Sequence, residues 1–145
     1  MSRLWAAAAS DRGSEAIEAA VGVPAFLLLI GLVIFGGRVA VTHQAVSAAA
    51  DQAARAASIA RTVDQAHTDS VAAAVASLDR QGLQCVSRSV TVDLGAFTAP
   101  PGTPAQVAST VTCQVDLADL AVPGVPGSHT VTATMSSPID TYRER

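Results

Sequence analysis

The sequence predicts an α+β chain. A long N-terminal transmembrane helix continues as an alanine-rich helix, and a small antiparallel sheet of about three strands follows. Three observations support this fold class: residues 19–37 carry no charge, 14 of the 32 residues from 45 to 76 are alanine, and polar and apolar residues alternate from residue 84 onward. These patterns are typical of a membrane span, a helix and half-buried strands, respectively.

The uncharged run begins at Ala19 and ends at Gly37. Its 19 residues of helix rise about 28 Å, close to the ~30 Å hydrocarbon core of a bilayer. We therefore predict a transmembrane helix over 19–37, preceded by a short leader over 1–18. The alternative is a secreted protein with a long cleaved signal peptide, because Ala48-Ala49-Ala50 resembles a cleavage site.

The leader carries a small excess of positive charge. Residues 1–12 hold Arg3, Arg12 and the amino terminus against Asp11. Positive charge beside a span favours the cytoplasmic side of the membrane. We expect a single-pass, signal-anchor protein of the cytoplasmic (inner) membrane, held in the lipid bilayer. Its N-terminus would be cytoplasmic and its C-terminal domain extracytoplasmic.

Residues 38–81 are predicted to form the alanine-rich extracytoplasmic helix. Two stretches show apolar residues at i, i+4 and i+7, the spacing of one helix face. An alanine face can approach another helix closely, and the alternative is a plain stalk without a partner. The two stretches are Ile59, Val63 and Ala66, and Val71, Val75 and Leu78.

A break in this helix is expected near 67–70. Asp69 or Ser70 could cap a second helix there, and Gly82 is a plausible stop for it. We therefore expect one helix from about Ser14 into the mid-60s and a second to about residue 81.

A small antiparallel domain is predicted over 84–136, with a flexible tail over 137–145. Apolar and polar residues alternate in three runs, which turn signals separate. The runs are Val86–Leu94, Val107–Leu117 with Val111, Cys113 and Val115 on one face, and Ser128–Ser136; the turns are Pro100-Pro101-Gly102 and residues 123–127.

Cys85 opens the first strand and Cys113 lies in the second. A hairpin that turns at Pro100-Pro101-Gly102 pairs residues whose numbers add to about 200, so these cysteines become near neighbours and can form a disulfide. A disulfide implies an oxidising compartment, in agreement with an extracytoplasmic domain. The alternative is two unrelated buried thiols, and without a C-x-x-C motif a redox or metal role is not expected.

Composition excludes several classes of function. The net charge is −3 and aromatic residues make up 3% of the chain, so neither a basic surface nor a stacking platform for nucleic acid is expected. His43, His67 and His129 lie on separate predicted elements, and no catalytic motif surrounds them. We expect no enzyme activity, no catalytic or metal-binding residues, no cofactor and no small-molecule substrate.

The residues before the span form a recognisable pattern. Gly13 is followed by five residues that end in Glu18, and a hydrophobic helix comes next, as in type IV pilin-like precursors. With the sequence downstream, residues 12–57 resemble the TadE-like family of tight-adherence (Flp) pilus assembly proteins. The matching residues are Arg12-Gly13-Ser14, Glu18, Pro24, Phe35-Gly36 and residues 49–57; Ala19 and Ile34 depart from the family by replacing an aromatic and an acidic residue.

The resemblance implies a minor pilin or pseudopilin, a structural component of a tight-adherence pilus or related secretion assembly. It also implies pilin-like or pilus-assembly membrane partners, and a prepilin peptidase that cuts between Gly13 and Ser14. The new amine on Ser14 and the carboxylate of Glu18 would then stand at i and i+4 on one helix face, where they can pair. The alternative function is a membrane-tethered extracytoplasmic adaptor that does not enter a fiber.

Overall fold

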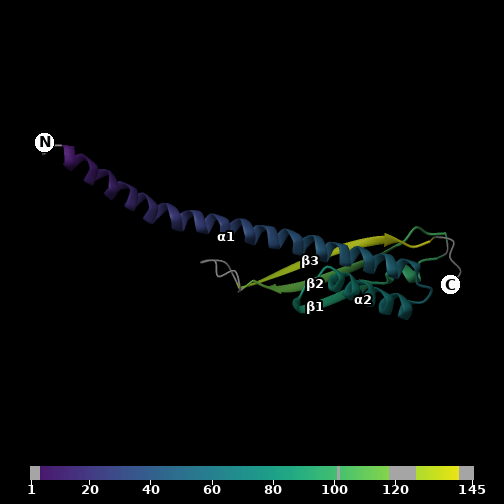
Figure 1. Cartoon of the computed structure of the whole chain (residues 1–145). Coiled ribbons are helices and arrows are strands. Elements are labelled where there is room, and N and C mark those ends of the chain that lie inside the picture. Colours follow the sequence, from purple (N-terminus) through teal and green to yellow (C-terminus); the bar gives the residue numbers. More distant parts are fainter. Residues whose placement is uncertain (1–3, 101, 118–126, 141–145) are drawn as a thin grey trace.

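The computed structural model describes residues 4–100, 102–117 and 127–140, with side chains from Ile17 onward. The elements in chain order are α1 (Leu4–Ile59), α2 (Val63–Arg80), β1 (Cys85–Asp93), the short 3₁₀ helix η1 (Gly95–Thr98), β2 (Gln106–Asp116) and β3 (Ser128–Pro138). Figure 1 shows that the C-terminal half of α1 forms a compact body with α2 and the sheet, and that the N-terminal half of α1 extends far beyond this body. The predicted α+β class is confirmed.

Helix α1 contains 56 residues and is therefore about 84 Å long. It begins at Leu4, ten residues before the predicted start near Ser14, and contains Pro24 without a break. It ends at Ile59, several residues earlier than predicted. The leader, the predicted span and the alanine-rich segment thus share one continuous helix.

The break between the helices lies at residues 60–62, so the prediction of a break near 67–70 is wrong. Thr62 caps α2, because its side chain accepts a hydrogen bond from the Gln65 backbone N–H at 3.2 Å. Ser70 lies inside α2, and its hydroxyl donates to the Ala66 carbonyl one turn earlier. A hydroxyl satisfied in this way does not need to cap a helix.

The turn at 60–62 also divides one of the predicted apolar faces. Ile59 is 80% exposed and Val63 is 48% exposed, whereas Ala66 is buried. The other predicted stretch fits better, since Leu78 is fully buried and Val71 and Val75 are half-buried. Helix α2 stops as predicted, because Gly82 adopts a left-handed φ of 66° that other residues disfavour.

The sheet is the predicted antiparallel meander, in the order β1-β2-β3. A bulge interrupts the β1–β2 pairing between Cys85 and Ser87, where one extra residue of β1 is inserted. The bulge lets Cys85 and Val90 both contact the core and turns Val86 outward, where it is 69% exposed. The predicted alternation placed Val86 on the same face as Val90, which is wrong for this reason.

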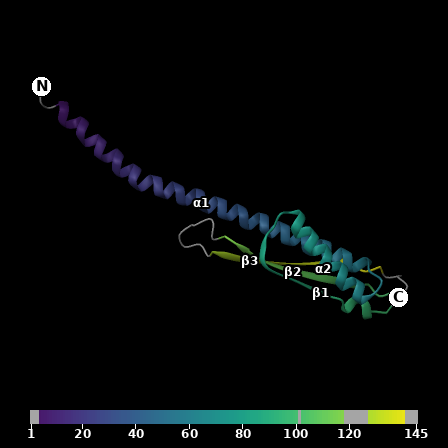
Figure 2. The ribbon, with the colours of Figure 1, turned by 60° about the horizontal axis from the view of Figure 1, so that its bottom comes forward.

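The core lies between the two helices and one face of the sheet (Figures 1 and 2). Alanine allows α1 to approach α2 and the sheet closely, because its side chain adds little bulk. The alanine face of α1 is therefore buried within the chain, and the alternative of a stalk without a partner is wrong. The buried residues of this face are Thr42, Ala45, Val46, Ala49, Ala50, Ala53, Ala54 and Ala57.

The predicted flexible tail over 137–145 is partly wrong. Ser137 and Pro138 belong to β3, and the Ser137 hydroxyl hydrogen-bonds Ser58 of α1 at 3.1 Å. Ile139 is buried, and its N–H donates to the Ala105 carbonyl at 3.0 Å. The burial of Ile139 and its main-chain hydrogen bond to Ala105, the residue just before β2, fix this segment. Residues 141–145 and most of the predicted turn at 123–127 lie outside the described residues.

Candidate membrane anchor and processing segment

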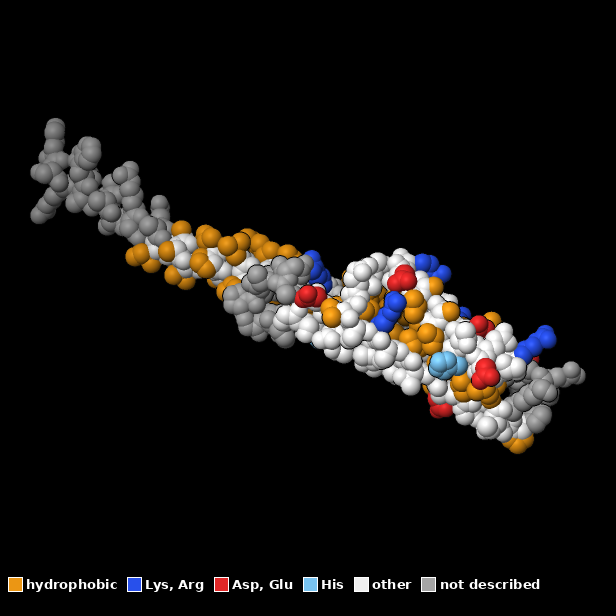
Figure 3. Space-filling model, turned by 90° about the horizontal axis from the view of Figure 1, so that it is seen from below, with side chains coloured by type: hydrophobic (Ala, Val, Ile, Leu, Met, Phe, Trp, Pro, Cys, Tyr) orange, Lys and Arg blue, Asp and Glu red, His pale blue; other side chains and the backbone are white. Residues whose placement is uncertain are grey.

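Residues 17–34 of α1 expose large apolar side chains at positions that lie on every side of the helix, and Figure 3 shows one face of this stretch. A helix that is apolar on every side is buried either in a protein core or in a membrane, and no element of the described chain covers this one. Among the described residues, one helical segment, Ile17–Ile59, is long and apolar enough to cross a membrane. The exposed residues are Ile17, Val21, Val23, Phe26, Leu27, Leu28, Leu29, Ile30, Leu32, Val33 and Ile34.

The folded body begins at the outer end of the predicted span. Phe35 and Val39 are half-buried and pack against the core cluster. Thr42 is buried one turn later, and its hydroxyl donates to the Arg38 carbonyl at 2.8 Å. The body therefore lies directly beside residue 37 with no linker. The sequence did not predict this, because Phe35 was assigned to the span on hydropathy alone.

The predicted boundaries of the span, Ala19 and Gly37, are both interior residues of α1. The helix passes through them without a change of backbone structure, so 19–37 stays a prediction from composition. The processing site between Gly13 and Ser14 also stays a prediction from the sequence. Gly13 and Ser14 are adjacent residues of α1, Glu18 lies one turn after Ser14, and the Glu18 side chain is exposed.

Polar residues interrupt the alanine-rich end of α1 because this part of the helix has one buried face and one exposed face. Asp51 and Arg55 form an ion pair at 2.9 Å, one helical turn apart, on the side away from the core. Ala50, Ala53 and Ala54 are fully buried. The segment therefore alternates a close-packed inner face with a solvated outer face, and the surface ion pair adds little to stability.

Cys85 and Cys113 form a disulfide, with their Cα atoms 5.4 Å apart. The alternative of two unrelated thiols is wrong. The β1–β2 ladder pairs Cys85 with Val115 and Arg88 with Cys113, so the predicted register is correct to within one residue. The bulge beside Cys85 brings the two cysteines together, and the bond ties β1 to the central strand.

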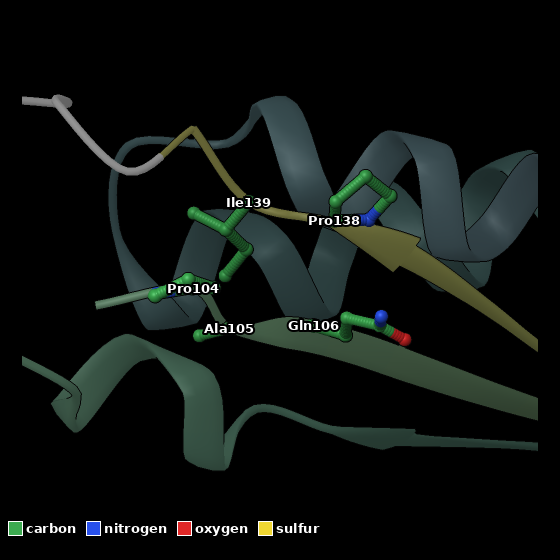
Figure 4. Close-up of a pocket in the computed structure, with 5 residues that line it drawn as sticks. All are labelled: Pro104, Ala105, Gln106, Pro138 and Ile139. Carbon is green, nitrogen blue, oxygen red and sulfur yellow. The ribbon is translucent and has the colours of Figure 1, made fainter. Parts of the chain in front are cut away.

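The three histidines lie on α1, α2 and β3, and no group of three or more His, Cys, Asp or Glu side chains is placed to hold a metal within the described chain. A pocket of about 250 Å³ opens where β2 begins and β3 ends (Figure 4). Gln106 supplies its one polar side chain, and no titratable side chain lines it. The other lining residues are Pro104, Ala105, Pro138 and Ile139.

Comparison with protein families identifies the N-terminal part of the chain. Residues 13–55 match the model of the family described as TadE-like protein. The predicted resemblance is confirmed. This TadE-like segment, residues 13–55, begins at the predicted processing site and ends within the buried alanine face of α1. No curated protein and no solved structure matches the chain. The TadE-like segment and the long apolar helix fit a pilus-associated membrane protein.

Proposed function

We propose that this chain is a membrane-anchored minor pilin or pseudopilin, a structural component of a tight-adherence pilus or a related secretion assembly. One observation carries the proposal. The TadE-like segment contains residues 17–34 of α1, whose large apolar side chains are exposed, and it continues into the buried alanine face against which the folded body packs. An anchor of this kind can pack laterally against the anchors of pilin-like or pilus-assembly membrane partners.

The proposed location is the cytoplasmic (inner) membrane, with the folded body on the extracytoplasmic side. The Cys85–Cys113 disulfide supports this orientation, because disulfides persist in oxidising compartments. Arg3 and Arg12 support it independently, since positive residues favour the cytoplasmic end of a span.

We further propose that a prepilin peptidase cuts between Gly13 and Ser14. The new amine would carry a positive charge at a helix N-terminus, which the helix dipole disfavours. Glu18, one turn later, offsets that charge within the chain or between neighbouring subunits. A carboxylate at the mouth of a membrane span is costly unless it is paired, so the pairing also stabilises Glu18.

Intact mass spectrometry of the membrane-extracted chain tests the processing step. In cells that contain the cognate peptidase, we expect the chain to lose its first 13 residues. Gly13→Val should retain them, whereas Gly22→Ala should be processed normally, because a Cβ at Gly22 meets nothing within 4 Å. An intact N-terminus in the unmodified chain contradicts processing.

A second candidate is a membrane-tethered adaptor that does not enter a fiber. The burial of the alanine face favours it, because that face is not available for contacts with other subunits. Cysteine cross-linking through Val33, which is exposed on the anchor, distinguishes the two candidates. A pilin-like component should give cross-links to like or pilin-like anchors, and an adaptor should give none. A buried control, Ala53→Cys, should be silent in both cases.

The structure gives no support to a secreted protein cleaved after Ala50. Such cleavage would remove Thr42, Ala45 and Val46 from the core. The sheet and α2 would then lose much of the helix surface against which they pack.

A further inference from the structure

The sheet has two edges, and they differ in how well they are protected. Natural edge strands are usually protected from further pairing by charges, bulges or shortness. Strand β1 has nine residues, a bulge, and the charged residues Arg88 and Asp93. Strand β3 has 11 residues, pairs with β2 at every position without a register shift, and carries no charged residue. The edge of β3 therefore lacks every protection that β1 has.

The main-chain groups on this edge can be identified from the ladder. The Leu117 N–H donates to the Gly127 carbonyl at 2.8 Å, and the Ile139 N–H donates to the Ala105 carbonyl at 3.0 Å, at opposite ends of the β2–β3 pair. Because hydrogen-bonded pairs alternate along an antiparallel ladder, the odd-numbered residues of β3 bond to β2. The main-chain N–H and C=O groups that point away from β2 belong to Thr130, Thr132, Thr134 and Ser136.

The side chains of the same residues lie on the sheet face opposite the helices. The Thr134 hydroxyl hydrogen-bonds that of Thr110 at 2.8 Å, and the Thr132 hydroxyl hydrogen-bonds that of Thr112 at 3.0 Å. Strand β1, which pairs with the opposite edge of β2, carries a similar row of hydroxyl side chains. Its hydroxyl residues Ser87, Ser89 and Thr91 pair with Gln114, Thr112 and Thr110. No strand among the described residues pairs with the outer edge of β3, and this edge repeats the pattern through which β1 binds β2.

We propose that the outer edge of β3 binds an extended, uncharged strand of another polypeptide in which hydroxyl and apolar residues alternate. Its main chain pairs with the free groups of β3, the mode known as β-augmentation. Its hydroxyl residues continue the row of Thr130, Thr132 and Thr134. Its apolar residues cover Met135, which is 37% exposed on the helix-facing side of the same strand. A charged strand is disfavoured, because β3 carries no opposite charge to compensate its desolvation.

The direction of α1 argues against a second copy of this chain as the partner. Helix α1 and strand β3 run in the same direction (Figures 1 and 2). Antiparallel pairing of β3 with its own copy reverses one α1, so the two anchors cannot enter one membrane from the same side; this step rests on the proposed membrane topology. Parallel pairing with β1 of a next copy meets the bulge and charges of that edge. A strand of a different polypeptide avoids both problems.

A synthetic peptide tests the proposal on the full chain in detergent or nanodiscs. The probe is residues 106–115 with Cys113→Val and a fluorescent label; it leaves out the charged Asp116, and this sequence already pairs with the hydroxyl row of β1. We expect saturable binding by fluorescence anisotropy. We also expect hydrogen exchange at the amides of Thr130, Thr132 and Thr134 to slow on binding, while the amides of Val131 and Ala133 keep the protection that β2 gives them.

Variants at Thr132 separate edge pairing from other modes of binding. Thr132→Pro removes an outward N–H and leaves the β2 ladder intact, so it should weaken binding about tenfold. Thr132→Ala removes only the hydroxyl and should weaken binding by less than about threefold. Unchanged exchange at Val131 and Ala133 shows that each variant is folded. Ser136→Pro provides a second edge variant and should act in the same direction as Thr132→Pro.

Three results would overturn the proposal. The first is the absence of peptide binding at millimolar concentration. The second is equal binding to Thr132→Pro and the unmodified chain. The third is protection of the Thr130 and Thr132 amides in the peptide-free chain that grows with protein concentration, which would show self-pairing instead. None of these results bears on the membrane anchor, so the proposed function can stand if this edge proposal fails.

Discussion

Replacing Leu78 by alanine should destabilise the folded body strongly. Leu78 is the largest fully buried side chain on α2 and belongs to the cluster that joins α1, α2 and the sheet. The change removes three carbon atoms, worth about 2.4 kcal/mol of transfer free energy, and leaves a cavity that adds to the loss. We expect the free energy of unfolding to fall by about 3 kcal/mol, within the range of roughly 2–5 kcal/mol typical of such changes.

Differential scanning calorimetry in mild detergent measures this effect. For a body of roughly 100 residues, a loss of about 3 kcal/mol lowers the unfolding midpoint by roughly 12–24 °C. Val63→Ala is the matched control on the same helix, because Val63 is 48% exposed, and it should shift the midpoint only slightly. A loss below about 1 kcal/mol for Leu78→Ala would refute the packing of α2 against α1 and the sheet.

Three further substitutions give graded effects in the same calorimetric assay. Replacing Cys85 and Cys113 together by alanine should cost about 3.5 kcal/mol by the chain-entropy estimate for a separation of 28 residues, and an unchanged midpoint would show that the bond does not constrain the unfolded chain. Thr62→Ala removes the cap that accepts from Gln65 and should cost about 1 kcal/mol, whereas Thr62→Ser should keep most of the stability. Gly82→Ala should cost about 1 kcal/mol through backbone strain alone, since a Cβ there meets nothing within 4 Å; a stabilised variant would contradict the left-handed φ.

The order of elements, the meander and the disulfide were predictable from local signals. Alternation of Val111, Cys113 and Val115 indicates one buried face, and all three are buried. The turn at Pro100-Pro101-Gly102 set the register closely enough to pair the cysteines. These features depend on residues near one another in the sequence or on simple hairpin geometry.

The position of the helix break and the orientation of Val86 were not predictable in the same way. The segment at 60–62 contains no Gly or Pro to mark the break. The break becomes evident from the packing of α2 against α1. The bulge that exposes Val86 is visible only in the pairing with β2. Both features follow from tertiary packing, which overrides local propensity.

The alanine face was recognised as a packing surface, but its partner was not. Alanine at i, i+3, i+4 and i+7 indicates close approach to something, and the same pattern suits a neighbouring subunit or the chain's own sheet. The partner is the face of the sheet that lies against the helices, since Val111 of β2 and Ala133 of β3 join Ala49 of α1 in one cluster. The Gly13–Ser14 site and the pairing of Glu18 stay predictions, because they depend on an event that follows synthesis.

Thiol labelling of the folded body tests the central claim, that the body is anchored on the extracytoplasmic side, most directly. Both native cysteines are joined in the disulfide, so Ser89→Cys, at an exposed position on β1, introduces a single free thiol. The account predicts that a membrane-impermeant maleimide labels the membrane-bound chain as fully in intact spheroplasts as after lysis. Labelling that appears only after lysis would place the body in the cytoplasm and contradict the account.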